Sequence, residues 1–366
     1  MTRPSQHPEL EALRGQVLAN CHRSDARYAG SFSLCGLLLR LRDYYKWEHD
    51  LAPWAEVDSP EVLGWVDERE TLWESIQGQE PADLVWRGRR VNPFETEVLN
   101  QDLAELGFYY GAGYAAFLKP SFFLARVLDE YEMDGFRVTY LDDEIARDLF
   151  TVPAQILGRE IVARIRPLAA YFWDSILYAG AWRRTAWSLA LAAHGLARDD
   201  LTGPAEEWAP RFREMLIEEM AAFVWHEYGE ATEPTLSRTR WRALVGANPY
   251  SRIELLARTL KDLLADVGDQ GRLRFIITNR RVGSLGIYVA QLDGLAARLF
   301  PEIGPAFDRF LKEQDWEDME AARSRAWKRV SGLGRDLMDL AEKSADRPGD
   351  WLAARVEEVF YQPLGL

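Results

Sequence analysis

The sequence predicts a mainly α fold of the α+β class, a multi-helical body with a small inserted β-hairpin or sheet. Apolar side chains recur at helical spacing between residues 33 and 106, and again from Pro167 to the carboxyl end. Aromatic and β-branched side chains are instead frequent between residues 121 and 165. The order of these patterns places the sheet inside a helical chain.

Three helices are expected before the sheet. The segment Ser33 to Asp50 has leucines at spacings of three and four, and Pro53 follows it. A second helix is expected to use Ser59 as its N-cap and to run to Ile76, because Pro60 and Glu61 follow as first-turn residues. The third is expected from Pro93 to Leu106, with Gly107 ending it.

The β region is expected to contain a hairpin. The strands Phe122 to Glu132 and Phe136 to Leu141 flank Asp134-Gly135, a pair typical of tight turns. The segment Gln155 to Ile165 adds a further expected strand, and Leu273 to Thr278 fits either a strand or a buried helix. These segments predict at most a small sheet.

The remaining chain is expected to be helical, with proline and glycine at nearly every junction. We expect two regions, residues 1–165 with the hairpin and residues 166–366, although no linker marks the border and one compact body is the alternative. The expected helices are 167–182, 184–197, 206–229, 235–245, 250–267, 284–299, 315–344 and 349–360.

The composition argues against two classes of partner. A formal net charge of −14 repels the phosphate backbone of nucleic acids, and the arginine clusters are short. No apolar run reaches the roughly 20 residues of a membrane span, and none near the amino end has signal-peptide length, so a cytoplasmic protein is expected. Fourteen tryptophans spread along the chain indicate packing almost throughout, or an interface with a protein partner or with a second copy.

Two cysteines, Cys21 and Cys35, are too few for a disulfide framework, so reduced thiols are expected. A redox pair formed through a turn near Gly30 is the alternative. His22, next to Cys21, would form a second polar centre if it faced Glu48 or His49.

The most informative polar residues are Glu219, His226 and Glu230. At about 100° per residue, their spacings of seven and eleven bring them within roughly 20° of one helical line. Phe212, Met215 and Phe223 lie on the same line, which predicts a core-facing stripe. Two carboxylates and an imidazole suit iron, manganese or zinc, and three ligands would leave open coordination positions.

Other interpretations of this stripe remain open. A solvated acidic face would cost only a few tenths of a kcal/mol per like-charged pair, and a buried face requires an arginine or backbone partner unless a metal is bound. If Gly229 caps the helix, Glu230 leaves the stripe.

The remaining motifs are weak or absent. Gly111-Ala112-Gly113 is a lone Gly-x-Gly, better explained by a tight turn with tyrosines packed on either side than by a dinucleotide site. The sequence contains no Walker loop, Gly-x-Ser-x-Gly or His-Glu-x-x-His, and no catalytic residues are assigned.

Two resemblances accompany these patterns. The spacing Glu219-x6-His226 is similar to the first metal helix of haem-oxygenase-like di-iron oxidases, over this helix only. The second resemblance is to a bacterial protein family of unknown function and implies a bacterial cytoplasmic protein without an assigned activity. It is carried by Cys21–Ala26, Leu37–Asp43, Tyr109–Tyr114 and Lys119–Ala125.

Two functional hypotheses follow. One is a non-catalytic helical binding or scaffold protein. The alternative is a metal-dependent enzyme, an oxidoreductase, with a Glu/His site on the helix around residues 210–230.

Overall fold

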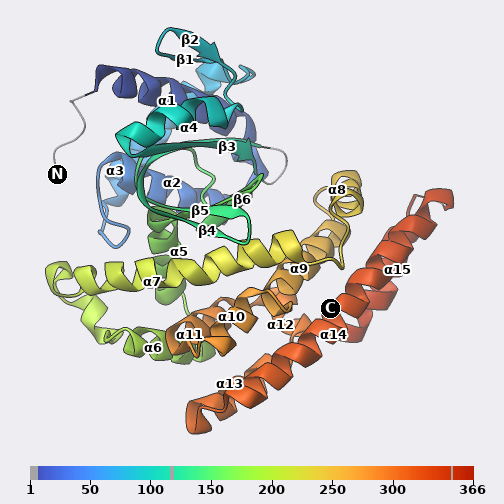
Figure 1. Cartoon of the computed structure of the whole chain (residues 1–366). Helices are drawn as coiled ribbons and strands as arrows, with labels where there is room; N and C mark the ends of the chain where they lie inside the picture. Colours follow the sequence, from blue (N-terminus) through green and yellow to red (C-terminus); the bar gives the residue numbers. More distant parts are fainter. Residues whose placement is uncertain (1–6, 116–118, 348) are drawn as a thin grey trace. The chain divides into compact units, whose positions relative to one another are not determined.

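The computed structural model describes residues 7–115, 119–347 and 349–366 (Figure 1). The chain divides into two compact units, unit 1 (Met1–Asp174) and unit 2 (Ser175–Leu366). Helices dominate and the main sheet lies in unit 1, which confirms the predicted mainly α fold with an inserted sheet. Among the described residues, no helix combines the length and the apolar character needed to cross a bilayer.

The first helix of unit 1 was not predicted. Leu10, Leu13, Val17 and Cys21 recur at spacings of three and four, and all four are fully buried. Their stripe packs on strand β4 (Pro120–Met133) of the sheet. The helices of unit 1 are α1 (Pro8–Tyr28), α2 (Leu34–Glu48), α3 (Ser59–Ile76), α4 (Thr96–Leu103) and α5 (Ile165–Leu177), which ends in unit 2.

The predicted helix ends were partly correct. The Ser33 hydroxyl accepts a hydrogen bond from the Gly36 N–H at 3.2 Å and is the N-cap of α2. Ser59 is not the N-cap of α3, because the helix already includes it and Asp58 takes that place. The third predicted helix starts three residues late, at Thr96, but Gly107 ends the segment with a φ of 71° as expected.

The predicted hairpin is present. Strand β4 (Pro120–Met133) pairs antiparallel with β5 (Phe136–Arg147), and Asp134 and Gly135 turn between them with φ values of 48° and 79°. The described residues form a five-stranded sheet of order β3-β4-β5-β7-β6, in which β5 and β7 are parallel. The other strands are β3 (Phe108–Tyr114), β6 (Ala154–Leu157) and β7 (Glu160–Arg164), and a two-stranded sheet joins β1 (Leu84–Trp86) to β2 (Arg89–Val91).

The tight turn expected around Gly111 is wrong, because this segment is strand β3, paired in register with β4. Gly111 is needed for close packing rather than for turning. A Cβ at this position would lie 2.0 Å from the Phe123 ring. Glycine therefore marks a crossing of side chain over backbone, a contact that the local sequence does not reveal.

Unit 2 is helical throughout its described elements. The segment Leu273 to Thr278, for which a strand or a buried helix was expected, is helical. The predicted helix 284–299 is two helices, and α13 was not predicted. The helices of unit 2 are α6 (Ala181–Ala193), α7 (Ala205–Thr232), α8 (Arg238–Ala247), α9 (Arg252–Val267), α10 (Arg272–Thr278), α11 (Val282–Gln291), α12 (Gly294–Leu299), α13 (Ile303–Glu313), α14 (Trp316–Lys343) and α15 (Trp351–Val356), followed by a π-helical turn (Glu357–Tyr361).

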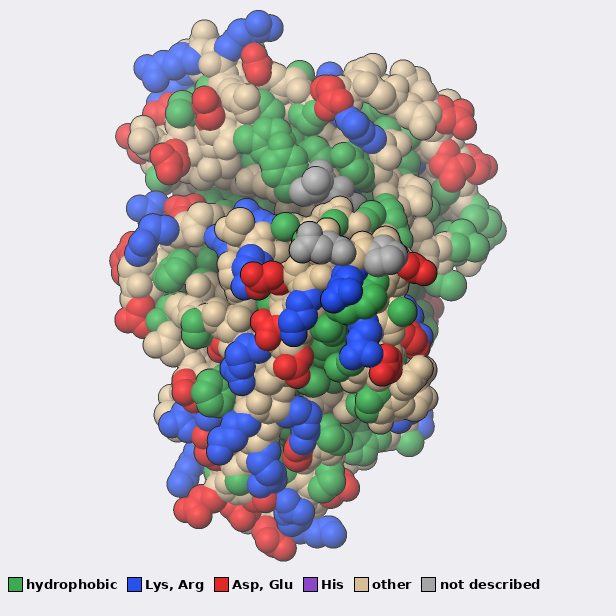
Figure 2. Space-filling view, turned by 90° about the vertical axis from the view of Figure 1, so that its right-hand side faces the viewer, with side chains coloured by type: hydrophobic (Ala, Val, Ile, Leu, Met, Phe, Trp, Pro, Cys, Tyr) green, Lys and Arg blue, Asp and Glu red, His purple; other side chains and the backbone are tan. Residues whose placement is uncertain are grey.

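Surface charges are largely intermixed. Figure 2 shows one face on which basic and acidic side chains alternate. Ion pairs of this kind join Arg240 to Glu342 at 2.6 Å and Arg252 to Glu357 at 2.7 Å. Pairs this exposed contribute at most about 1 kcal/mol each, so they do not decide the fold.

Candidate functional site

Helix α7 continues through Gly229, so the expected cap at this position is wrong. A Cβ at position 229 would lie 2.3 Å from the carbonyl oxygen of Ala265 in α9. Glycine here lets the backbones of α7 and α9 approach closely. Because the helix does not end, Glu230 stays one turn beyond His226 on the same face.

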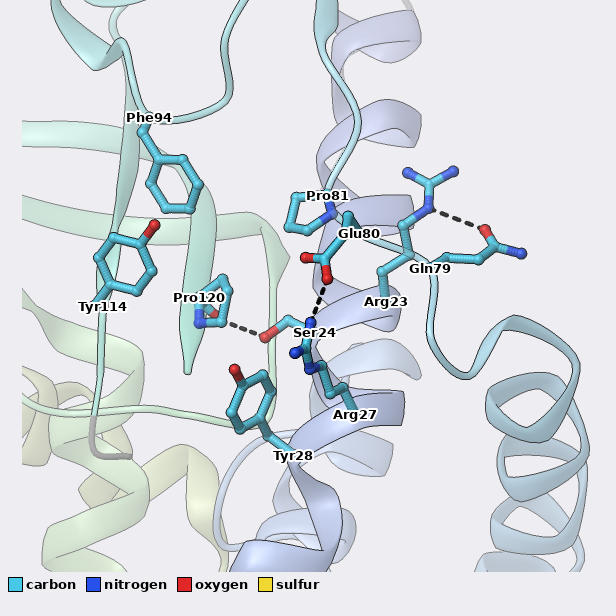
Figure 3. Close-up of a pocket in the computed structure, with 10 residues that line it drawn as sticks. All are labelled: Arg23, Ser24, Arg27, Tyr28, Gln79, Glu80, Pro81, Phe94, Tyr114 and Pro120. Atoms are coloured by element: carbon cyan, nitrogen blue, oxygen red, sulfur yellow. Dashed lines mark hydrogen bonds and ion pairs between the residues drawn. The ribbon is translucent and has the colours of Figure 1, made fainter. Parts of the chain in front are cut away.

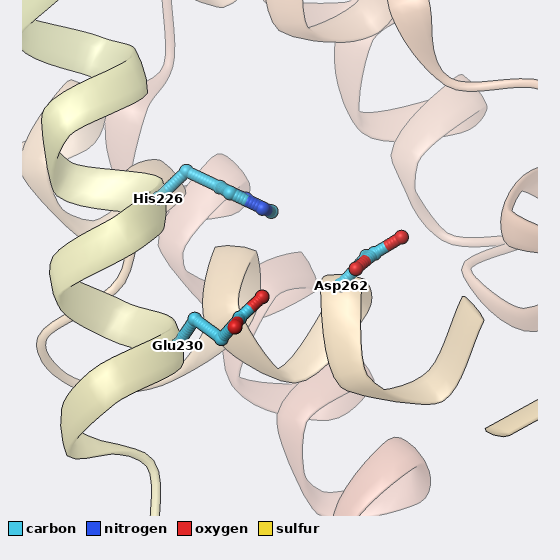
Figure 4. A group of neighbouring side chains, drawn as sticks. All are labelled: His226, Glu230 and Asp262. Carbon is cyan, nitrogen blue, oxygen red and sulfur yellow. The ribbon is translucent and has the colours of Figure 1, made fainter. Parts of the chain in front are cut away.

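Three side chains from these two helices converge. His226 and Glu230 extend from α7 toward the side of α9 that carries Asp262 (Figure 4). One possible ligand atom from each lies within 4.8 Å of the other two. Ligand atoms around one zinc ion are about 3–4 Å apart, so a contraction of about 1 Å would form a coordination shell. His226 and Glu230 are partly exposed and Asp262 is exposed, so the group is open to solvent.

Asp266, one turn beyond Asp262, orients the imidazole. Its Oδ1 lies 2.8 Å from Nδ1 of His226. Among the described residues, Nε2 of His226 has no hydrogen-bonding partner, so it can coordinate a cation once the imidazole has lost its proton. Burial lowers the pKa of His226, but Asp266, Glu227 and Asp262 outweigh it and raise the pKa to about 10.

The group carries an excess of carboxylates. Burial raises the pKa of Glu227 to about 7, and Glu230 adds to this shift while His226 opposes it. Within the described part of the chain, Lys261 is the one lysine that forms an ion pair with the three converging side chains, and it binds Glu230. A position where carboxylates repel one another and protonation relieves the repulsion is suited to a cation.

Glu219 has different partners. Its Oε1 lies 2.9 Å from Nε2 of His194, and its Oε2 accepts a hydrogen bond from the Ser284 hydroxyl at 2.6 Å. All three side chains are buried, and a Cβ on Gly283 would lie 2.6 Å from the imidazole. Glu219 separates the serine from the histidine, so these residues do not form a nucleophile and base. Of the three predicted ligands, the structure brings His226 and Glu230 together.

Sequence reasoning missed Asp262 and Asp266. They repeat on α9 the i, i+4 spacing that His226 and Glu230 have on α7. That shared spacing was the available signal. The pairing of α7 with α9, which brings the two pairs together, depends on Gly229 and could not be deduced from either helix alone.

Unit 1 contains a second, buried charge cluster. Lys119, just before β4, lies 3.0 Å from Asp25 of α1 and 3.3 Å from Asp148, which follows β5. All three side chains are at most 2% exposed. Burial and Asp148 raise the pKa of Asp25 to about 7 although Lys119 opposes this shift, and the two carboxylates raise the pKa of Lys119 despite its burial.

Backbone groups complete this cluster. The Leu149 N–H donates to both oxygens of Asp25 at 3.2 and 3.1 Å. The N–H groups of Phe122 and Phe150 donate to Asp148 at 3.0 and 2.7 Å. Every carboxylate oxygen therefore has a donor, so the cluster joins α1, β4 and the end of β5 without a free coordination position.

The segment Cys21–Asp25 does not form a thiol site. Both cysteines are free, Cys21 buried and Cys35 exposed, so the alternative of a redox pair is not present in this structure. The Cys21 thiol donates to the Phe122 carbonyl at 3.3 Å, and burial raises its pKa well above the usual value. A thiol in this environment stays protonated and unreactive.

His22 and Glu48 do meet, but through a third residue. Arg69 of α3 lies 3.1 Å from Nε2 of His22 and binds Glu48 at 2.7 Å. Burial and the arginine lower the pKa of His22 to about 4. The expected second polar centre is therefore an arginine-bridged contact among α1, α2 and α3.

A cavity of about 150 Å³ lies beside the buried cluster in unit 1 (Figure 3). Phe94 and Tyr114 stack at 4.8 Å on one side, and Arg27 pairs with Glu80 on the other. The Ser24 hydroxyl donates a hydrogen bond to the Pro120 carbonyl rather than into the cavity. Its charged side chains already have partners, and we assign it no ligand.

Comparison with known proteins gives one result. No curated protein and no solved structure matches the chain, and the similarity to haem-oxygenase-like di-iron oxidases is not shown by any of the comparisons. Two family models match, the N-terminal domain of a family of unknown function over residues 12–164 and its C-terminal domain over residues 169–359. The chain therefore belongs to the family of unknown function DUF6866.

Proposed function

We propose that unit 2 binds a divalent cation through His226, Glu230 and Asp262. The observation that carries this proposal is the convergence of one imidazole and two carboxylates from α7 and α9, with their ligand atoms within 4.8 Å. The Asp266 carboxylate beside Nδ1 supports it, because metal-bound histidines commonly donate a hydrogen bond from their other ring nitrogen to a carboxylate.

The donor set limits the choice of cation. Imidazole nitrogen and carboxylate oxygen suit zinc, manganese and iron, whereas a site for calcium would consist of oxygen ligands. Three protein ligands leave positions for water or a substrate, which is the arrangement of a catalytic rather than a structural site. The proposed class is thus a metal-dependent protein; iron or manganese in this position could itself change oxidation state in an oxidoreductase, whereas zinc could act only as a Lewis acid.

Glu219 is not part of the proposed ligand set. Ser284 and His194 already occupy its two oxygens, and the side chain is 2% exposed. Asp262 takes its place because it shares a space with His226 and Glu230. Replacing Glu219 should therefore leave metal binding intact, whereas replacing Asp262 should not.

The test is metal analysis of protein purified without chelator, followed by calorimetric titration of chelator-treated protein with Zn²⁺ and, separately, Mn²⁺. His226→Ala with Asp262→Asn should abolish binding, while Glu219→Gln should retain it. His49→Ala, at an exposed histidine in unit 1, is the control for loss of a histidine. Wild-type protein without a stoichiometric site for either ion would refute the proposal.

A protein partner or a homo-oligomer also stays a prediction, as do the expected lack of nucleic-acid binding and the cytoplasmic location. Leu34 and Leu38 of α2 are 73% and 48% exposed, and Leu63 of α3 is 58% exposed. Apolar exposure of this kind suits association. Sedimentation of wild type and of Leu34→Ser with Leu38→Ser would show whether these leucines hold a second copy.

A further inference from the structure

Lys261 lies beside the proposed cation site. It comes from α9, directly before Asp262, and its ammonium forms an ion pair with Glu230. The two side chains are 21% and 22% exposed, so the pair is partly screened from solvent. Lys261 and the proposed metal ion therefore compete for the Glu230 carboxylate.

A second partner for the same ammonium lies close by. Nζ of Lys261 is 4.4 Å from the ring centroid of Trp241 in α8. The indole N–H donates to the Ala257 carbonyl at 2.9 Å, which holds the ring face toward the lysine. When the ammonium leaves Glu230, it still has a cation–π contact and does not lose every partner.

We propose that Lys261 is a built-in counter-ion of the cation site, which a divalent cation displaces from Glu230 toward the Trp241 ring. This inference rests on the proposed function. A lysine in this position lowers the repulsion between Glu230 and Asp262 while the metal is absent. It also weakens cation binding, because the incoming ion must take Glu230 from it and then stays near its positive charge. Lys261 thereby sets the concentration at which the site fills.

Arg258 provides a matched control. It also belongs to α9, one turn before Asp262, and its guanidinium lies 5.7 Å from the Trp241 ring centroid. Its carboxylate partner, however, is Glu254 at 2.8 Å, which is not among the proposed ligands. Removing Arg258 deletes the same charge from the same helix and the same ring without releasing Glu230.

The experiment is titration of chelator-treated protein with Zn²⁺ for wild type, Lys261→Met and Arg258→Met. Lys261→Met should lower the Kd about tenfold, the effect of removing one charge about 6 Å from a divalent ion in water, while Arg258→Met stays within about twofold. Equal tightening in both variants, or none in Lys261→Met, overturns the counter-ion role while the proposed site stands. A wild-type chain that binds neither Zn²⁺ nor Mn²⁺ overturns both, and if it binds Mn²⁺ alone the same three titrations are made with Mn²⁺.

Tryptophan emission gives a second measurement. Displacement of Lys261 changes the charge over the Trp241 ring, so Zn²⁺ should change the emission of wild type. The part of this change that comes from Trp241 should be absent in Trp241→Phe and in Lys261→Met. Zn²⁺ binding to the wild type with no Trp241-dependent change in emission contradicts the displacement.

Discussion

The two units each contain a cluster of two carboxylates and a basic nitrogen, and the clusters differ in every physical respect that matters for binding. In unit 1, Lys119 lies between Asp25 and Asp148, all at most 2% exposed. In unit 2, His226 and Glu230 are partly exposed and Asp262 is exposed. The composition of the clusters is similar, but the second is more accessible to solvent.

The two clusters differ in which groups hydrogen-bond to their carboxylates. Three backbone N–H groups saturate Asp25 and Asp148, one from Phe122 in β4 and two from Leu149 and Phe150, just after β5. In the cluster of unit 2, the described partners are side chains, Asp266 for His226 and Lys261 for Glu230. Burial with full hydrogen bonding holds a fold together, whereas open ligand atoms with excess charge suit a cation.

Replacing Lys119 tests whether the buried cluster is needed for the stability of the fold. Lys119→Met leaves two buried carboxylates without their ammonium, which should lower the free energy of unfolding by about 3–5 kcal/mol. Urea unfolding followed by circular dichroism measures the loss. Lys261→Met, at the open cluster, is the control and should cost about 1 kcal/mol or less. A similar loss in both variants would show that the two clusters do not differ as described.

The stability of unit 1 should also depend on pH through Asp25. The pKa of Asp25 is raised to about 7 in the folded chain, above its usual 3.8, so the folded state holds a proton that the unfolded state releases near pH 4. The contribution of Asp25 to stability is therefore greatest below pH 4 and falls as the pH rises to 7, by at most about 4 kcal/mol. The raised pKa of Lys119 acts only at alkaline pH, outside this window.

Asp25→Asn tests this dependence, because the amide cannot titrate. The difference in unfolding free energy between wild type and Asp25→Asn should shift in favour of the variant from pH 4 to pH 7 and then stay level. Urea unfolding at several pH values gives this difference directly. A difference that is independent of pH would mean that Asp25 stays ionised throughout.

How much could be predicted from the sequence depends on the distance between interacting residues. The helix end at Gly107 and the turn at Asp134-Gly135 were predicted because each signal and its effect lie within three residues. The pairing of β3 with β4 and the meeting of Asp262 with His226 join segments that are far apart in sequence. Periodicity gives the face of a helix but not the element against which that face packs.

Glycine shows the same limit. Gly111 and Gly229 were interpreted as turn and cap residues, since glycine is favoured at both. In the structure, each is a position where a side chain would collide with a neighbouring element. The residue type announces a backbone constraint, but only the fold distinguishes a positive φ from a close approach.

Gly229 connects that constraint to the cation site. Gly229→Ala would place a Cβ 2.3 Å from the Ala265 carbonyl oxygen, so α7 must shift away from α9. We expect a loss of about 1–3 kcal/mol in unfolding free energy, as for other overpacked positions, together with weaker Zn²⁺ binding because His226 and Glu230 move away from Asp262. Thermal unfolding and the Zn²⁺ titration measure both effects.

The control for this substitution is Gly246→Ala in α8, where a Cβ would meet nothing within 4 Å. Alanine should stabilise that helix by up to about 1 kcal/mol, since it lacks the backbone entropy of glycine. Opposite signs at the two glycines would establish that close packing of α7 on α9 requires Gly229. If Gly229→Ala instead keeps both stability and Zn²⁺ affinity, the open cluster does not depend on the approach of these two helices. Its ligands would then have to be held by their side-chain partners, Asp266 and Lys261, alone.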